Sequence, residues 1–219
     1  MKILSINISE PTKTIFNGKE LITSIFKKPV EGEVEITDMG ITGDTQADLK
    51  VHGGYDKAIY AYSHKHYKMW SDELNKNFQD YGLVGENLTV DDFDEKNIYI
   101  GDKIRISNCL VQVTQPRIPC YKLGIKMNDK GFPKLFSQSC YVGGYLRVLD
   151  VGKISREDEL KVVKREPNSL SLFDIANLIF KDINNVKKMK QALDIASLTE
   201  EIKERFRERL MKLGDFGSL

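Results

Sequence analysis

The stretch DKIRISNCLVQVTQPRIPCYKL, residues 102–123, contains the two patterns on which the fold of this chain depends. Two segments of it, 102–107 and 110–115, alternate aliphatic residues with polar ones, which is typical of half-buried β-strands. The pattern then changes at two prolines, and a short helix is expected to begin at Pro119. The second strand therefore leads directly to a cysteine, Cys120, at the start of a helix.

Other short strands are expected on both sides of this stretch. Segments of strand composition occupy residues 2–8, 14–26, 33–37, 57–62 and 145–151. The second of them carries a hairpin signal at Asn17-Gly18. Many short strands of this kind favour a barrel or a sandwich over alternating β-α units.

A few helices interrupt the strands. Residues 63–78 place Tyr67, Trp70 and Leu74 on one face at helical spacing, with Phe78 following. Another short helix is expected at 132–139. The expected fold class is therefore mainly β with α, a β-barrel with peripheral helices.

Residues 168–219 have a different character. Three helical patterns, separated by short polar turns, cover 168–180, 184–196 and 197–213. Pro167 marks the break. We therefore expect a β-barrel domain over residues 1–166 and a three-helix C-terminal appendage over 167–219.

Composition narrows the class of protein. The 219 residues include 33 Lys and Arg against 32 Asp and Glu, so no strong field attracts nucleic acid or anionic lipid. Three cysteines without a CxxC pair argue against a disulfide framework and fit a reducing cytosol. No stretch resembles a signal peptide or a membrane helix. The expectation is a cytoplasmic protein that binds neither nucleic acid nor membranes.

Cys120 is the first candidate for chemistry. In the first turn of a helix, unpaired N–H groups favour an anion, and Arg117 adds a positive charge three residues upstream. Both effects favour the thiolate, which attacks electrophiles and binds metals. The alternative is a buried cysteine beside a structural turn. For Cys109, in a strand pattern, and for Cys140, at a helix end, a structural role is the preferred interpretation.

A second candidate segment is GDTQADLKVHGGYDKAIYAYSHKHY, residues 43–67. Its adjacent glycines let backbone N–H groups approach an anionic ligand, and Lys57 supplies a charge for phosphate. His52 and Asp56 lie in the same segment, although a single histidine is more often structural than a base or ligand. A third cluster, GENLT at 85–89, offers Asn87 at a junction between a loop and a strand.

Together these segments resemble a known family. GDTQADLKVHGGYDKAIYAY, GENLT and QPRIPCYKL are similar to the signature segments of MOSC domains, named from the C-terminal domain of molybdenum cofactor sulfurases. The three-helix tail makes the resemblance closer to the stand-alone YiiM type. The resemblance covers nearly the whole chain, with the segments in the same order.

The resemblance implies a strand-rich MOSC barrel that binds the molybdenum cofactor, a molybdopterin whose dithiolene holds the metal. It implies that Cys120 is the protein ligand to molybdenum and the catalytic cysteine. Arg117 would bind the pterin phosphate or an oxo ligand. Lys57 and His52 would line the same pocket, and Asp56 or Asn87 would orient them.

The implied activity is the two-electron reduction of N-oxygenated compounds, such as N-hydroxylated purines, amidoximes or hydroxylamines, with a role in detoxification. The chain has neither a dinucleotide fingerprint nor the cysteine spacing of an iron–sulfur cluster, so an external flavin or iron–sulfur reductase is the expected electron donor. It also lacks the pyridoxal-phosphate domain of some sulfurases, so a complete cofactor sulfurase is not expected. The oligomeric state stays open, and a dimer is compatible with the sequence.

Three other interpretations remain open. The protein could be a molybdenum cofactor or sulfur carrier that holds a persulfide on Cys120 without reducing any substrate. It could also be an interaction protein whose tail docks a partner. A hydrolase using Cys120 and His52 has no further pattern in its support.

Overall fold

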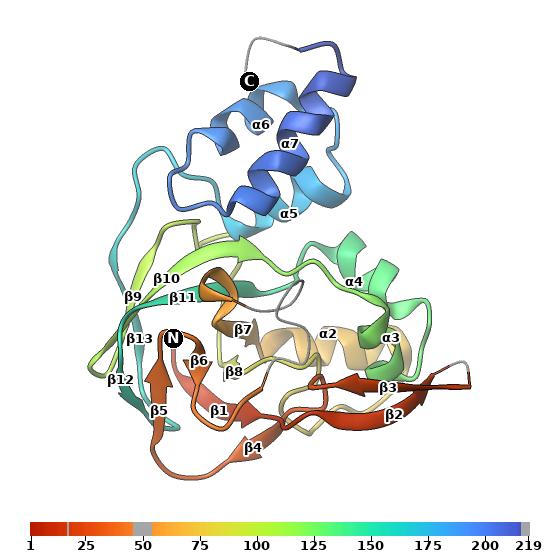
Figure 1. The fold of residues 1–219 in the computed structure, drawn as a ribbon, viewed down its shortest axis with the longest axis vertical. Helices are drawn as coiled ribbons and strands as arrows, with labels where there is room; N and C mark the ends of the chain where they lie inside the picture. The colour runs from red at the N-terminus through yellow and green to blue at the C-terminus, as the bar shows by residue number, and fades with distance from the viewer. Residues whose placement is uncertain (17, 46–53, 216–219) are drawn as a thin grey trace.

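The computed structural model describes residues 1–16, 18–45 and 54–215. Its centre is an eight-stranded sheet with the strand order β13-β9-β10-β11-β7-β8-β1-β4 (Figure 1). Neighbouring strands are antiparallel except for β7 and β8, which are parallel. The strands are β1 (Ile3–Ile8), β4 (Lys28–Val30), β7 (Ile59–Ser63), β8 (Leu88–Val90), β9 (Lys103–Ile106), β10 (Cys109–Pro116), β11 (Gly144–Asp150) and β13 (Leu160–Lys164).

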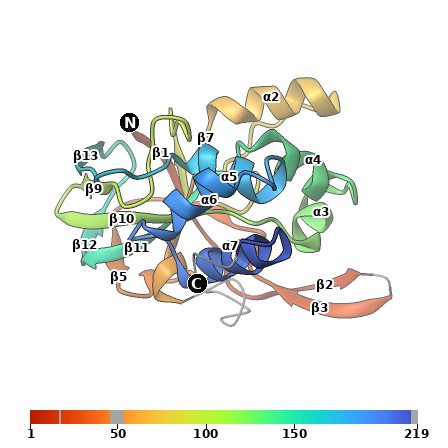
Figure 2. The ribbon, with the colours of Figure 1, turned by 90° about the horizontal axis from the view of Figure 1, so that it is seen from above.

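Two smaller sheets complete the β structure. One contains β12 (Gly152–Ile154), β5 (Val34–Thr37) and β6 (Gly40–Ile41), and the other contains β2 (Thr12–Phe16) and β3 (Lys19–Thr23). The predicted hairpin is confirmed, because Phe16 pairs with Lys19 across the turn and Gly18 has a φ of 74°. This hairpin extends from the body of the molecule (Figure 2).

The expected fold class is confirmed, but the described strand pairings do not include a continuous ladder that closes a barrel. β13 and β4 form the edges of the main sheet. An isolated bridge between Lys2 and Glu159 joins the start of β1 to β13. Beside it, the Leu160 amide donates to the Met1 carbonyl at 2.8 Å. The sheet therefore curves far enough for the edge strand β13 to meet the start of β1, the neighbour of the other edge strand.

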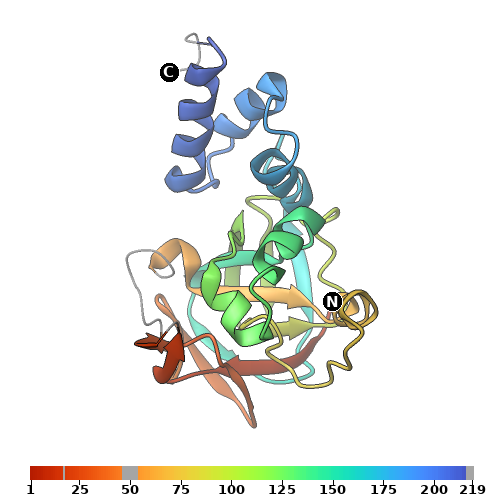
Figure 3. The same ribbon diagram turned by 90° about the vertical axis from the view of Figure 1, so that its right-hand side faces the viewer.

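Helices α2 (Lys65–Leu74), α3 (Tyr121–Met127) and α4 (Phe132–Ser139) pack beside the sheet (Figure 3). α2 is shorter than the predicted 63–78, because Asn75 adopts a left-handed conformation with φ 48° and ends the helix. α3 does not begin at Pro119 as expected. Cys120 is extended (φ −117°), and its carbonyl accepts the Leu123 amide at 3.0 Å, so Cys120 precedes the first turn.

The three predicted tail helices are present as α5 (Leu172–Phe180), α6 (Val186–Leu193) and α7 (Glu200–Lys212), and they lie together at one end of the molecule (Figures 1 and 3). α5 and α6 begin with side-chain caps from Ser171 and Asn185. No helix in the described ranges is long and apolar enough to cross a membrane.

The first tail helix is closely joined to the β domain. The Leu172 amide donates to the Ile98 carbonyl at 2.8 Å, and the Ile100 amide donates to the Leu170 carbonyl at 3.0 Å. Leu172 and Ile175 are fully buried in the same hydrophobic core as the strands of the main sheet. The division into domains at residue 166 stays a prediction, because buried residues of all three tail helices belong to the same core cluster as the strands.

Candidate active site

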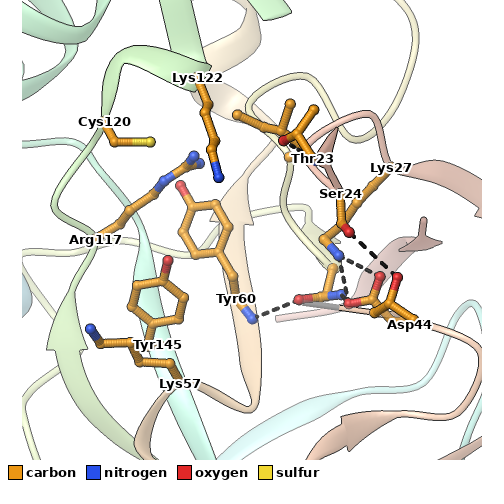
Figure 4. A pocket seen from close by; sticks show the side chains of 14 residues that line it. Thr23, Ser24, Lys27, Asp44, Lys57, Tyr60, Arg117, Cys120, Lys122 and Tyr145 are labelled. Atoms are coloured by element: carbon orange, nitrogen blue, oxygen red, sulfur yellow. Dashed lines mark hydrogen bonds and ion pairs between the residues drawn. The ribbon is translucent and has the colours of Figure 1, made fainter. Parts of the chain in front are cut away.

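A cavity of about 630 Å³, part of it open to solvent, lies where β10 leaves the main sheet (Figure 4). Segments from the whole β domain supply its wall: the end of β3, the residues after β6, the start of β7, the loop before β8, the exit of β10, α3 and β11. The lining residues are Thr23, Ser24, Ile25, Lys27, Asp44, Thr45, Lys57, Tyr60, Gly85, Asn87, Arg117, Cys120, Lys122 and Tyr145.

Arg117 is a buried cation in this wall. Its exposed fraction is 7%. Its Nη1 donates to the Val84 carbonyl at 2.5 Å, and its guanidinium carbon lies 4.7 Å from the centre of the Tyr60 ring. Among the described residues, no carboxylate lies within 4.0 Å of it. A buried charge with only neutral partners is costly, so the arrangement favours a site that is completed by an anion.

Cys120 and Lys122 lie beside Arg117. Figure 4 shows the Cys120 thiol, the Lys122 ammonium and the Arg117 guanidinium directed toward the same part of the cavity. Cys120 is half-buried, whereas Cys109 and Cys140 are fully buried. Burial raises the pKa of both of those thiols. Cys120 is therefore the cysteine whose position allows contact with a ligand.

Two tyrosines form the floor of the cavity between these cations and the core. Burial raises the pKa of Tyr60 and of Tyr145, and the nearby Arg117 cation offsets only part of this effect. Both phenols therefore stay protonated near neutral pH. The Tyr60 hydroxyl donates to the Val142 carbonyl at 2.8 Å. The two ring centres are 5.3 Å apart, within a buried aromatic cluster that keeps this wall rigid.

The opposite wall holds a buried ion pair between Lys27 and Asp44. The two side chains are only 9% and 5% exposed. Asn87 fixes the pair, because its Nδ2 donates to Asp44 Oδ2 at 2.8 Å while its Oδ1 accepts the Tyr60 amide at 3.1 Å. Burial lowers the pKa of Lys27, and Asp44 offsets part of that decrease. This wall has little net charge, so the positive field of the cavity comes from the side with Arg117 and Lys122.

Lys57 and Asp56 leave η1 (Tyr55–Lys57) in different directions. Lys57 lines the cavity, and its Nζ lies 2.5 Å from the Glu201 carboxylate of α7. Asp56 is not among the lining residues, and its carboxylate lies 3.2 Å from Arg147 Nη2. His52 lies outside the described residues. The structure thus brings Cys120, Arg117, Lys57 and Asn87 to one cavity, and Asp56 to its outer side.

The GENLT cluster has a structural basis. Gly85 has a φ of 86°, and a Cβ there would lie 3.0 Å from the Ile25 carbonyl oxygen. The fully buried Glu86 carboxylate accepts the Val84 amide at 3.0 Å and the Thr89 hydroxyl at 2.9 Å, and it also accepts the Tyr67 hydroxyl. Glu86, Leu88 and Thr89 of the motif are therefore buried in the core, while Asn87 faces the cavity.

The lining residues that sequence reasoning did not assign to the site include Lys27, Asp44, Tyr60, Lys122 and Tyr145. The sequence could have indicated Lys122 and Asp44, because they lie inside the two segments that contain the other candidates. The two tyrosines look like ordinary strand residues. Lys27 has no local signal, because only its tertiary pairing with Asp44 places it here.

Comparison with known proteins shows the family of the chain. The family model of the MOSC domain matches residues 48–161. The chain belongs to the MOSC domain family. It is 34% identical to the uncharacterized protein YflK of Bacillus subtilis, over 96% of this chain and 95% of that one. The crystal structure of YiiM from Geobacillus stearothermophilus is similar with a TM-score of 0.81 and 32% identity, over 95% of this chain and 98% of that one.

A more distant relative has a name that refers to an activity. A protein named "Reductase" from Gibberella moniliformis is 29% identical over 74% of this chain, and the matched part is 29% of that longer protein. These matches establish a MOSC-domain protein, and both YflK and the Geobacillus YiiM are matched over almost their whole length.

In this MOSC protein, Lys126 adds a titratable charge to the field of the cavity. It lies one helical turn after Lys122 on α3. Burial, with a smaller contribution from the Arg117 and Lys27 cations, lowers the pKa of Lys126 to about 8. The Glu86 carboxylate, and to a smaller extent Asp80, act in the opposite direction. Between about 8 and the ordinary value of 10.5, the unfolded chain binds more protons at this lysine than the folded chain does, so folding stability at this site rises with pH.

This shift predicts a pH-dependent affinity for anions. Sulfate does not titrate in this range, and we expect its dissociation constant to increase about threefold from pH 7 to pH 9 as Lys126 loses its charge. Isothermal titration calorimetry at several pH values measures the effect. The Lys126→Met variant is expected to give a flat profile over the same range. An unchanged slope in that variant would assign the titration to another group.

Proposed function

We propose that this MOSC protein binds the molybdenum cofactor in the cavity and reduces N-oxygenated compounds with electrons from a separate reductase. One observation carries the proposal. The buried Arg117 guanidinium, with no carboxylate within ion-pair distance in the described part of the chain, lies beside the Cys120 thiol in one cavity. The site therefore offers a soft metal ligand and an anion-binding group to the same molecule.

The residues present fit the cofactor. A thiolate is the ligand type that suits a sulfur-rich metal site, and Cys120 would supply it. Arg117, with Lys122 and Lys57, would bind the anionic phosphate of the pterin. In the described ranges, no group of three or more His, Cys, Asp and Glu residues could hold a metal ion. A cofactor that brings its own sulfur ligands needs only one ligand from the protein.

When bound, the molybdenum centre would supply a two-electron redox change. For a hydroxylamine the net reaction is R–NHOH plus two electrons plus two protons, giving R–NH2 and water. An external flavin or iron–sulfur protein is the source of the electrons.

Protein side chains bind and orient the substrate and hold the protons. The half-buried Lys122 has no carboxylate within ion-pair distance among the residues described, so its Nζ can donate a hydrogen bond to the substrate oxygen. The Tyr60 and Tyr145 rings would exclude water from one side. Relatives support the general role and not the particular substrate: the MOSC family is associated with molybdenum cofactor binding, and one relative carries the name reductase.

The test measures product formation by chromatography. Protein loaded with molybdenum is given 6-hydroxylaminopurine or benzamidoxime together with NADH alone, with NADH and a flavoprotein reductase, or with a reduced low-potential dye. We expect no turnover with NADH alone and turnover with the other two donors. Inactivity of the loaded protein with the dye and both substrates would contradict the reductase function. A persulfide on Cys120 in the same sample would then identify a sulfur carrier.

A further inference from the structure

The C-terminal appendage contacts the cavity through the start of α7. The Thr199 hydroxyl donates to Gln115 Oε1 at 2.7 Å, and Gln112 Nε2 donates to the Ser197 hydroxyl at 2.8 Å. Thr199, Ser197 and Gln115 are all buried. Arg147 Nη2 also donates to the Ser197 carbonyl at 2.7 Å. These hydrogen bonds fix the first turn of α7 against β10 and β11, two residues away from Arg117.

The first turn of α7 places a carboxylate at the edge of the cavity. Glu201 is about half-exposed, and its carboxylate lies 2.5 Å from Lys57 Nζ, whereas the Lys57 side chain is only 12% exposed. Lys57 belongs to the lining of the cavity. Glu201 therefore reaches in from outside the β domain and neutralises one of the cations that an anionic ligand would contact.

A ligand phosphate and a protein carboxylate compete for the same ammonium group. An anion that approaches Lys57 must either displace Glu201 or accept a like charge a few ångströms away, which weakens binding. Arg117 and Lys122 carry no such competitor within ion-pair distance in the part of the chain that the structure describes. The two sides of the cavity thus differ. Arg117 and Lys122 can bind an anion directly, whereas Lys57 forms an ion pair with Glu201 of α7.

We propose that Glu201 is a residue through which the C-terminal helices set the affinity of this cavity for anions. The inference rests on the proposed anion-binding function of the cavity. Anion binding at Lys57 releases Glu201, so binding and the docking of α7 are thermodynamically coupled. The appendage is then a part of the binding site and acts on it through the ion pair between Glu201 and Lys57.

The test uses inorganic sulfate and isothermal titration calorimetry. We expect Glu201→Gln to tighten sulfate binding about fivefold, because the competing charge is removed while an amide oxygen remains for Lys57. Glu200→Gln is the matched control: Glu200 lies in the same turn, pairs with Arg207 and is 72% exposed, so its variant should bind sulfate as the unaltered protein does. In a Lys57→Met background, Glu201→Gln should have no effect.

The outcomes separate this inference from the proposed function. Sulfate binding that depends on Arg117 but is unchanged or weaker in Glu201→Gln would overturn the role of Glu201 alone. Tightening that persists in the Lys57→Met background would also overturn it. Sulfate binding that Arg117→Met does not affect would overturn the anion-binding cavity and the inference together. Hydrogen exchange offers a second readout, since added sulfate should lower amide protection in the first turn of α7 in the unaltered protein but not in Glu201→Gln.

Discussion

Replacement of Cys120 by serine is expected to remove molybdenum from the protein while leaving the fold intact. The serine hydroxyl keeps the size of the thiol but is a poor ligand for a soft metal site, so metal affinity should fall by about 100-fold or more. The Cys120 side chain is half-buried and makes no capping hydrogen bond to α3, so the substitution removes no structural contact there. Elemental analysis of protein made in a cofactor-competent host gives the molybdenum content directly.

The other two cysteines provide the controls. Cys109 and Cys140 are fully buried away from the cavity, so Cys109→Ala and Cys140→Ala should retain molybdenum even if each loses some stability. Equal molybdenum content in all three variants would remove Cys120 from the role of metal ligand. A persulfide on Cys120 in unaltered protein that contains no molybdenum would instead favour the sulfur-carrier alternative.

The sequence predicted those features that depend on local pattern. Alternation over 102–107 and 110–115 identified β9 and β10, and helical spacing identified all three tail helices. The segments around Lys57, Asn87 and Arg117 do meet at one cavity. These predictions succeed because period, turn residues and charge are properties of neighbouring residues.

Features that depend on tertiary contacts could not be predicted. Asp56 and Lys57 are adjacent in the sequence, yet one pairs with Arg147 outside the cavity and the other lines it. The Lys27–Asp44 pair and the contact from Glu201 join residues that are 17 and 144 positions apart. The start of α3 was predicted at Pro119, two residues before the observed start at Tyr121, because Cys120 continues the extended path of β10.

Replacement of Arg117 by methionine should weaken ligand binding without a loss of stability. The variant loses the charge-assisted hydrogen bonds that the guanidinium would make to an anion, so sulfate affinity should fall by about 100-fold or more. Stability of the ligand-free protein should stay within about 1 kcal/mol or rise, because an apolar side chain of similar volume replaces a buried cation that has only the Val84 carbonyl and the Tyr60 ring as described partners. Calorimetric titration and chemical denaturation measure the two effects.

Arg165 is the matched control, because it is an arginine whose role is structural. Its Nε lies 2.9 Å from the carboxylate of Asp102, which is fully buried. Arg165→Met leaves that carboxylate without its cation, so it should cost about 1–3 kcal/mol of stability and leave sulfate binding unchanged. If Arg117→Met destabilised the protein as much as Arg165→Met and still bound sulfate, Arg117 would be a structural arginine too. For Arg117 we expect loss of sulfate binding without loss of stability. The buried charge of a ligand-binding arginine lowers the free energy of unfolding when no ligand is bound, and it increases the affinity for an anion.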